Sequence, residues 1–402
     1  MGVTTATRVT IPPDLTLENL SEHPEGRKVL TCIQCGICAG TCPYGDVMEY
    51  PPSRIIAMLR AGLVEKVFTS DSLLNCVACY ACRAKCPRDI RLTGVLLPLV
   101  KEQMFVHRPE VPAELQKALE NTLRYGNPGG ESARKRALWV KTAGVPIRTL
   151  SEDPRPCDVL WFVECYTSYH PRGQDNARAT ARLLHALQVD FAILGNEEKC
   201  AGECARLVGE RGLFDTLMDY NMAVFRNYHF NRIMTSGAHA YDAFTYVYPA
   251  VGFHYKVEHS TPFFATSLDR LKPLLKRKLS YTVTYHDSCC LGRHNRFYEE
   301  PRSLLRAIPG IKLVEMTHTG INSICCGGGG GGMWLDTYYK AKGYERLSER
   351  RVREAVATGA DVLAVSCPYE VSRFEDALKV TGGDKQMVVR DVTELLAESL
   401  ES

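Results

Sequence analysis

The sequence lacks a long apolar run and a strong excess of charge of either sign. No stretch approaches the roughly 18 consecutive apolar residues of a membrane-spanning helix, and the first residues, MGVTTATRVTIPPD, lack the apolar core of a signal peptide. We therefore expect a cytoplasmic protein with no membrane span of its own, which can still dock to the cytoplasmic face of a membrane complex. Lys and Arg number 49 against 46 Asp and Glu, and this net charge of +3 does not favour nucleic acid as a partner.

The length and the cysteine content narrow the class of protein. A chain of 402 residues with 45% apolar and 24% charged residues is globular and too long for one hydrophobic core, so at least two domains are expected. Because no export signal precedes them, the 17 cysteines predict metal ligands or redox groups rather than a disulfide framework. Eight lie in two dense runs before residue 90 and nine are spread from Cys157 to Cys367, which indicates two kinds of site.

The two dense runs share the spacing C-x2-C-x2-C-x3-C-P, which is that of bacterial ferredoxins. In that arrangement three neighbouring thiolates bind one 4Fe-4S cubane and the fourth reaches the other cubane. The expected ligands of the first cubane are Cys32, Cys35, Cys38 and Cys86, and those of the second are Cys76, Cys79, Cys82 and Cys42. Zinc is the alternative, but tetrahedral zinc sites use paired C-x2-C motifs, which these triples do not match. Two neighbouring cubanes would form an electron relay.

The remainder of the chain follows a different pattern, which occurs twice. From Cys157 onward, short β-branched and aromatic runs alternate with amphipathic segments, as in parallel sheets with crossover helices. Cys165 and Cys289 are 124 residues apart, Cys200 and Cys325 are 125 apart, and Gly237 and Cys367 are 130 apart, which indicates an internal duplication. We expect a flexible arm over residues 1–25, a helical ferredoxin domain over 26–106, a linker with one helix over 107–156, and repeats over 157–275 and 276–402.

The second repeat concentrates unusual chemistry at its expected strand ends. The motif HDSCC places Cys289 and Cys290 after one strand, and SCPYE places Cys367 after another. Strand ends of an open parallel sheet converge on one crevice, where ligands bind. The pair Cys325 and Cys326 leads into six glycines, which we interpret as allowing close backbone approach and N–H donation to sulfur rather than as a phosphate loop.

These motifs resemble a known family. Tandem ferredoxin runs, CIQCGICAGTCP and CVACYACRAKCP, followed by two cysteine-rich repeats with YHDSCCLGR, CCGGGG and SCPYE, resemble the catalytic subunit of heterodisulfide reductase, above all forms in which both parts share one chain. Iron-sulfur subunits of anaerobic metabolism look similar. The resemblance implies an α+β multidomain fold, in which an N-terminal α-helical ferredoxin module with two 4Fe-4S clusters precedes a duplicated α/β CCG domain. It also implies that a complete CCG repeat supplies five cysteines to a noncubane 4Fe-4S cluster that reduces or forms a disulfide.

Carried over residue by residue, the resemblance fits the second repeat better than the first. The catalytic positions that it implies are Cys289, Cys325, Cys326 and Cys367. Glu370 stands at the position of the fifth cysteine, which leaves three alternatives. Its carboxylate binds iron, the additional Cys290 takes the place of the missing ligand, or four thiolates hold the cluster. The first repeat is degenerate, with Ala201, Gly237 and Ala240 at cysteine positions. Its candidate residues are Cys165, Cys200, Cys204 and His239, either as ligands of a further iron-sulfur cluster or another metal, or as packing residues.

Two functions follow as hypotheses. In the first, the chain is an oxidoreductase subunit in which electrons cross two cubanes to a noncubane cluster that performs thiol/disulfide chemistry. In the second, it is an electron relay without its own substrate, linking a partner enzyme to a flavoprotein or to a membrane cytochrome or quinone-reactive subunit. His286 and Asp287 precede Cys289 and either cap a local turn or, for His286, donate a proton or a hydrogen bond at the cluster.

Overall fold

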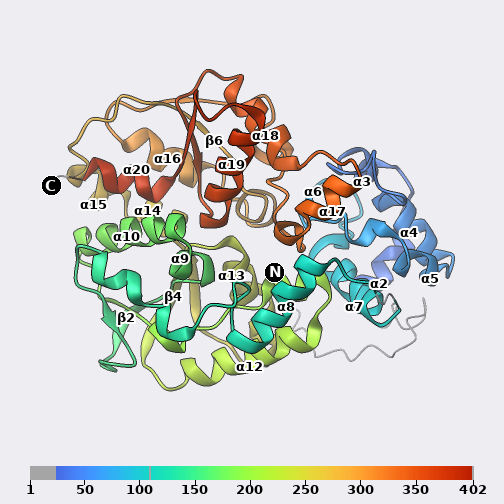
Figure 1. Cartoon of the computed structure of the whole chain (residues 1–402), viewed down its shortest axis with the longest axis horizontal. Coiled ribbons are helices and arrows are strands. Elements are labelled where there is room, and N and C mark those ends of the chain that lie inside the picture. The colour runs from blue at the N-terminus through green and yellow to red at the C-terminus, as the bar shows by residue number, and fades with distance from the viewer. Residues whose placement is uncertain (1–23, 108–109, 401–402) are drawn as a thin grey trace.

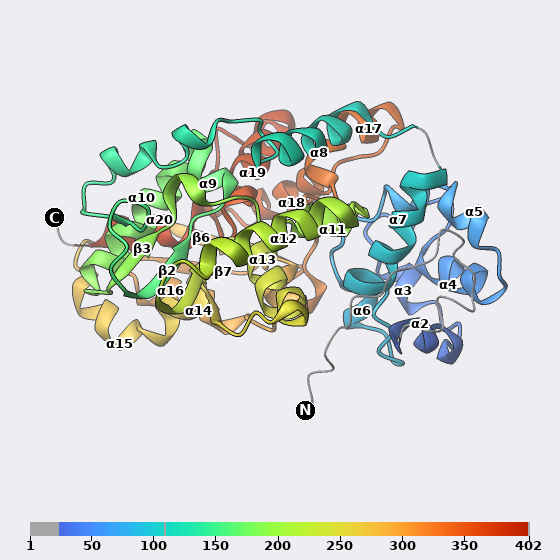
Figure 2. The ribbon, with the colours of Figure 1, turned by 90° about the horizontal axis from the view of Figure 1, so that it is seen from below.

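The structure, a computed structural model, describes residues 24–107 and 110–400. The arm expected over residues 1–25 lies outside the described residues except for its last two. A helical N-terminal domain occupies one end of the molecule, and two α/β units occupy the other (Figure 1). Figure 2 shows the same division from below, with the outer helices of the N-terminal domain far from the strands. Within the described residues, no helix is long and apolar enough to cross a membrane.

The N-terminal domain consists of short helices around the two cysteine runs. Its elements are α2 (Pro24–Lys28), η1 (Val29–Thr31), α3 (Ile37–Gly40), α4 (Pro52–Arg60), α5 (Val64–Phe68), η2 (Asp71–Leu73), α6 (Ala81–Ala84), η3 (Leu92–Leu96) and α7 (Leu97–His107). Helix α4 lies between the runs, begins with a proline at its first position and buries Ile55, Ile56 and Leu59. The apolar stripe therefore anchors the loop that joins the two runs.

The stretch expected as a linker is packed against the first α/β unit. It contains α8 (Ala113–Tyr125), η4 (Ala133–Lys135), η5 (Leu138–Thr142) and β1 (Arg148–Thr149). Strand β1 pairs in parallel with β3 (Phe191–Ile193), and the ring of Trp139 meets that of Trp161 edge-on at 5.5 Å. The linker therefore contributes an edge strand and part of the core. A strand of two residues is too short for a periodic pattern to predict.

The two α/β units have the same strand order. The first contains β2 (Cys157–Phe162), α9 (Cys165–Tyr169), α10 (Pro171–Ala186), β3, η6 (Gly195–Glu197), α11 (Glu203–Val208), α12 (Arg211–Phe225), β4 (Phe230–Thr235), α13 (Ala238–Asp242), η7 (Ala243–Val247), η8 (Tyr248–Val251), β5 (Lys256–His259), α14 (Ser260–Thr266), α15 (Leu268–Leu271) and η9 (Lys272–Leu274). The second contains β6 (Thr282–Tyr285), η10 (Cys290–His294), α16 (Glu299–Ala307), β7 (Lys312–Val314), η11 (Gly320–Asn322), η12 (Gly332–Trp334), α17 (Asp336–Ala341), α18 (Leu347–Val356), β8 (Val362–Val365), α19 (Pro368–Thr381), β9 (Val388–Asp391) and α20 (Val392–Ser399). The parallel sheets run β1-β3-β2-β4-β5 and β7-β6-β8-β9. Apart from β1, one order repeats the other.

The two units pack against each other through α10 and α20. Asn176 donates to the Thr393 hydroxyl at 2.8 Å, and Arg172 pairs with Glu394 at 2.7 Å and with Glu375 at 2.8 Å. One hydrophobic core contains buried residues of both sheets, so the repeats form a single body. The carboxyl ends of their strands carry the cysteines of the two repeats.

The glycine run lies directly on the loop of the second ferredoxin run. A Cβ built on Gly329 would lie 2.6 Å from the carbonyl oxygen of Val77, and one on Gly330 would overlap the carbonyl oxygen of Cys76. Around this contact, the Tyr339 hydroxyl donates to the Leu74 carbonyl at 3.3 Å. The run therefore permits close backbone approach to the cysteine loop of the N-terminal domain.

This contact generates a stability prediction. Gly330→Ala should lower the free energy of unfolding by about 1–3 kcal/mol more than Gly343→Ala, because only the first added methyl group meets a backbone oxygen. Gly343 is a matched control, since both glycines have positive φ, +58° and +72°, and a Cβ at Gly343 would have no neighbour within 4 Å. Thermal unfolding of the two variants measures the difference. Equal midpoints would contradict the close contact.

Candidate iron-sulfur centres

The two ferredoxin runs adopt matching loop conformations. Gln34 and Gly36 have positive φ in the first run, and Ala78 and Tyr80 have positive φ at the corresponding places of the second. Alternating left-handed residues turn successive backbone N–H groups toward one point, which suits an anionic group. In the first loop, the N–H of Gln34 already donates to the sulfur of Cys32 at 3.4 Å.

The first set of thiols lines one cavity at the outer side of the N-terminal domain. The cavity is lined by Cys32, Cys35, Cys38 and Cys86, among other residues. Burial, then the neighbouring thiol of Cys32, raises the pKa of Cys38 to about 11. The fourth cysteine of the second run thus lies beside the first three of the first run, and the donor set fits a cubane. The role of these four as ligands stays a prediction.

The second set of thiols lies deeper. Burial, then the thiol of Cys79, raises the pKa of Cys42 well above its ordinary value, with further contributions from Cys76 and Cys82. Cys42 therefore lies among the first three cysteines of the other run. The Nζ of the buried Lys101 donates to the carbonyl of Cys76 at 3.2 Å. These four thiols also form a donor set that suits a cubane.

In the second repeat, cysteines from three segments meet at the strand ends. Cys289 follows β6, Cys367 begins the turn into α19, and Cys325 lies between β7 and the glycine run. The sulfurs of Cys325 and Cys289 are 3.9 Å apart, and the N–H of Gly327 donates to the sulfur of Cys325 at 3.3 Å. The last contact is the predicted donation from the glycine run to sulfur. All of these cysteines are buried.

The position of the missing fifth cysteine is occupied by a polar cluster. Ligand atoms of His286, Cys326 and Glu370 lie within 4.8 Å of one another, and all three residues are buried. The Nε2 of His286 is 3.2 Å from a carboxylate oxygen of Glu370, and Arg351 donates to Nδ1 at 3.1 Å. Burial lowers the pKa of His286, but the adjacent Glu370 and Cys326 raise it more, so this pKa lies above its ordinary value. The other carboxylate oxygen of Glu370 is buried and has no hydrogen-bond partner among the described residues, which suits a metal ligand.

The additional cysteine of the HDSCC motif faces the first repeat. Cys290 lies beside the carboxyl group of Asp242, which accepts a hydrogen bond from Asn295 at 2.7 Å. Burial raises the pKa of Asp242 well above its ordinary value. Cys290 also contacts Cys289. The thiol of Cys290 therefore has a partner in the apposed repeat, a contact that sequence analysis did not anticipate.

The second ferredoxin set and the second-repeat set adjoin each other. The thiol of Cys79 lies beside that of Cys325 across the junction of the two domains, and this neighbour lowers the pKa of Cys79 to about 6. Arg293 bridges the same junction, since its Nε donates to the Cys79 carbonyl at 2.7 Å and its Nη1 to the Ser323 carbonyl at 2.5 Å. Burial lowers the pKa of Arg293, but the neighbouring thiols of Cys79 and Cys289 raise it more, so this pKa lies above its ordinary value. A buried cation therefore lies between the two sets.

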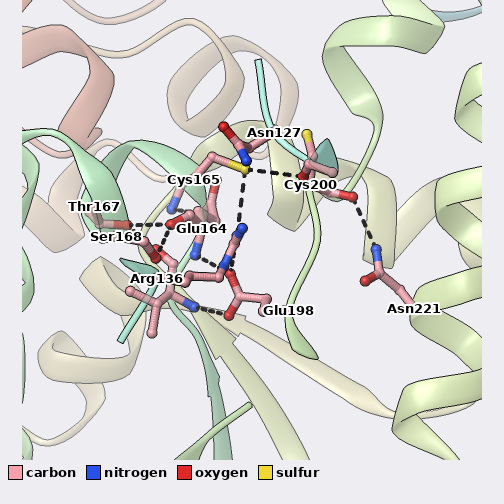
Figure 3. A network of polar contacts seen from close by, with 12 residues as sticks. Asn127, Arg136, Glu164, Cys165, Thr167, Ser168, Glu198, Cys200 and Asn221 are labelled. Atoms are coloured by element: carbon pink, nitrogen blue, oxygen red, sulfur yellow. Dashed lines mark hydrogen bonds and ion pairs between the residues drawn. The ribbon is translucent and has the colours of Figure 1, made fainter. Parts of the chain in front are cut away.

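The first repeat holds an ionic network in the corresponding place (Figure 3). Arg136, from the expected linker, pairs with Glu198 at 2.6 Å and donates to the sulfur of Cys165 at 3.5 Å. Glu198 in turn accepts from the backbone N–H groups of Val163 and Glu164. A hydrogen bond with Cys200, and then Arg136, lower the pKa of Cys165 to about 7. Sequence reasoning missed these partners because they come from distant segments.

A carboxylate occupies the place of a lost thiolate in the first repeat. A Cβ built on Gly237 would overlap the carboxylate of Glu164, which accepts a hydrogen bond from the N–H of Gly237 at 2.5 Å. Burial raises the pKa of Glu164 to about 8. Of the predicted residues, Cys165 adjoins Cys200, and the sulfur of Cys204 is 3.6 Å from Nδ1 of His239. These pairs form no compact group of ligands like that of Glu370, at least among the described residues.

Comparison with known proteins gives the same division of the chain. A cysteine-rich domain, CCG, matches residues 159–239 and again 283–369, and a 4Fe-4S dicluster domain matches residues 31–91. A probable iron-sulfur-binding oxidoreductase of Bacillus subtilis is 32% identical over 90% of this chain and 50% of its own length. An EtfAB:quinone oxidoreductase of Syntrophomonas wolfei is 31% identical over 92% of this chain and 58% of its own length.

Both of these relatives are longer than the chain, which spans half or somewhat more of their length. A third relative matches along nearly all of its length. This protein, a dihydromethanophenazine:CoB–CoM heterodisulfide reductase subunit of Methanosarcina mazei, is 30% identical over 92% of this chain and 93% of its own length. The resemblance inferred from the motifs is confirmed: the chain belongs to the iron-sulfur protein family that joins a 4Fe-4S dicluster domain to two CCG cysteine-rich domains and includes this heterodisulfide reductase subunit.

Proposed function

We propose that this iron-sulfur electron-transfer protein conducts single electrons through two cubanes to a noncubane cluster in the second repeat, where a disulfide and two thiols are interconverted. The first cubane would be held by the outer set of four thiols and the second by the inner set. The third cluster would be held by Cys289, Cys325, Cys326, Cys367 and the carboxylate of Glu370. The reaction balances as one disulfide, two electrons and two protons giving two thiols.

The observation that carries this proposal is the junction where Arg293 donates to the carbonyl of Cys79 at 2.7 Å and Cys79 shares a core cluster with Cys325. It joins the inner ferredoxin set to the second-repeat set, while the outer set lies at the surface. The three sets thus form a line from the exterior to the strand ends of the second repeat. A line of neighbouring centres suits single-electron transfer, because no atoms need to move between them.

The residues around the third centre support chemistry with sulfur. When bound there, an iron-sulfur cluster with an open iron position supplies a place for a substrate sulfur and a store for one electron. Carboxylate is a harder and weaker ligand for such iron than thiolate, so Glu370 favours an iron position that opens. His286 lies against that carboxylate on the other side, and Arg351 orients the imidazole by donating to its Nδ1. The burial of all these groups excludes bulk water from the site.

Partners are part of the proposal. A two-electron reaction fed by single electrons needs a redox partner, and we propose other subunits of a complex, a flavoprotein or a membrane cytochrome or quinone-reactive subunit. The names of the relatives, a quinone oxidoreductase and a heterodisulfide reductase subunit, support this choice.

One observation favours the second candidate function, an electron relay without its own substrate. The five cysteines of the second repeat are only 1–8% exposed. A relay needs no access for a substrate, whereas thiol chemistry requires that a small thiol reach the site. The last experiment of this subsection separates the two candidates.

The crossed grouping of thiols generates a spectroscopic prediction. Cys42→Ser should alter the signal of the cubane bound by Cys76, Cys79 and Cys82, because Cys42 lies among them. Cys86→Ser is the matched control and should alter the signal of the other cubane. Electron paramagnetic resonance of the reduced variants measures both. If each variant altered the cubane of its own run, the crossed grouping would be wrong.

Arg293 generates a prediction on redox potential. Arg293→Gln should lower the midpoint potentials of the second cubane and the third cluster by on the order of 50–100 mV, because a buried cation stabilises the reduced, more negative state. Arg293→Lys, which keeps the charge, should recover most of the loss. Anaerobic redox titration followed by spectroscopy measures both variants. A change confined to the first cubane would contradict the assigned position of the charge.

Thiol chemistry at the third centre is tested directly. An oxidised preparation exposed to a small thiol should give a new paramagnetic signal, because substrate sulfur would bind at the third centre. Cys325→Ala should abolish that signal and leave the ferredoxin signals intact. Cys157→Ala is the control, since this buried cysteine lies at the start of β2, away from the candidate ligands. A fully iron-loaded protein that gives no thiol-dependent signal would support the electron relay instead.

A further inference from the structure

The outer ferredoxin set opens at a surface that is unusually apolar. Ile33 is 63% exposed, Leu30 is 50% exposed and Ile37 is 42% exposed. All three lie in or beside the loop of the first cysteine run, and Ile33 and Ile37 line the cavity of the first set. Among the 17 cysteines, all of which are described, only Cys35 is exposed. Apolar side chains gathered around a single exposed ligand position indicate an interaction site rather than scattered surface residues.

The charge around this surface is positive. Arg88 is exposed and lines the same cavity, and Arg60 is exposed and donates to the carbonyl of Cys32 at 2.9 Å. The adjacent acidic residue, Asp89, is paired with Lys28 at 3.2 Å. An apolar centre with a basic rim is complementary to a protein that surrounds an apolar patch with carboxylates.

The position in the fold agrees with these observations. Helices α3 and α4 lie on the outer side of the N-terminal domain, whereas α6 faces the second repeat (Figure 1). The inner set and the second-repeat set are buried. The outer set is therefore the place where a protein-bound electron carrier can come nearest to the line of centres.

We propose that this surface, the docking face of Leu30, Ile33, Cys35, Ile37, Arg60 and Arg88, binds an acidic one-electron carrier protein with an exposed cofactor edge, such as a flavoprotein. The inference rests on the proposed first cubane. In each encounter the carrier loses one electron and the first centre gains it, and neither bond nor proton moves there. Carrier complexes of this kind are small and short-lived, so basic and acidic rims act mainly on the association rate.

The test uses the full iron-loaded chain and reduced flavodoxin, an acidic flavoprotein, as the probe. Stopped-flow reduction gives the second-order rate constant, and calorimetry with oxidised flavodoxin gives the dissociation constant. At low salt, Arg88→Glu should lower the rate constant about tenfold and weaken binding, and the difference should disappear near about 0.5 M salt. Ile33→Ser, a second variant, should weaken binding at both salt concentrations.

The matched controls lie on α8, where Leu123 is 66% exposed and Arg124 is exposed. Arg124→Glu and Leu123→Ser should leave both measurements within about twofold of the parent, since they carry the same changes to a surface away from the cysteine loops. Equal effects of the α8 and docking-face variants would overturn the inference. The inference would also be overturned if deletion of residues 1–23 increased the rate constant, because the chain's own segment would then occupy the docking face. A rate constant that falls as the protein concentration rises would overturn it too, because a second copy of the chain would then be the occupant.

Reduced methyl viologen separates this inference from the proposed function. Because this small cation needs no docking face, it should reduce the first centre of every variant, at the parent rate or, with Arg88→Glu, somewhat faster. If methyl viologen reduces the centre while flavodoxin is insensitive to Arg88→Glu, the docking face is wrong and the line of centres stands. If the centre is reduced through the docking face but no thiol-dependent signal follows, the docking face stands and the thiol chemistry is wrong. Absence of a reducible first centre would overturn both.

Discussion

The backbone contact between the Cys76–Cys82 loop and the glycine run is the constraint on which the rest of the structure depends. Gly329 and Gly330 have no side chains where the loop passes, so the two backbones meet directly. A contact made by backbone cannot be altered by a change of rotamer, and it holds the thiol of Cys79 against that of Cys325. The same junction carries a continuous hydrophobic core, so the N-terminal domain and the second repeat behave as one rigid unit.

Burial makes the thiolate form of these cysteines, which is the form that binds metal, unfavourable unless a cation lies nearby. Burial raises the pKa of Cys82 to about 12 and raises that of Cys42 well above its ordinary value, because a buried thiolate loses its hydration. The chain supplies few compensating charges, with Arg293 at the domain junction and Lys101 beside Cys76. Metal ions would supply the missing positive charge, and their binding energy would then contribute to folding. The electrostatics of the donor sets thus agree with thiolate-bound metal centres.

The parts of this structure that could be predicted from sequence are those encoded by local spacing. The paired C-x2-C-x2-C-x3-C-P runs and the near-equal offsets of Cys165 and Cys200 from their counterparts predicted the domain types and a duplicated unit with parallel strands. What sequence could not predict depends on contacts between distant segments. Strand β1 is two residues long, and Arg136 reaches the first repeat from a stretch whose sequence predicts a linker. At Gly237 the sequence shows only that a cysteine is missing. The carboxylate that fills its place belongs to Glu164, which is far away in the chain.

The degenerate first repeat has a structural role that its lost cysteines conceal. Its own centre is filled by the carboxylate of Glu164 and by the pair of Arg136 and Glu198, which satisfy one another within the protein. At the same time, its helix α13 forms a wall of the other repeat's site. The backbone of Ala238 lies beside the thiol of Cys367, and the carboxyl group of Asp242 lies beside Cys290. A single repeat would leave these thiols open to water. The first repeat therefore serves the second as a surface against which its cysteines are buried, and this role does not depend on a cluster of its own.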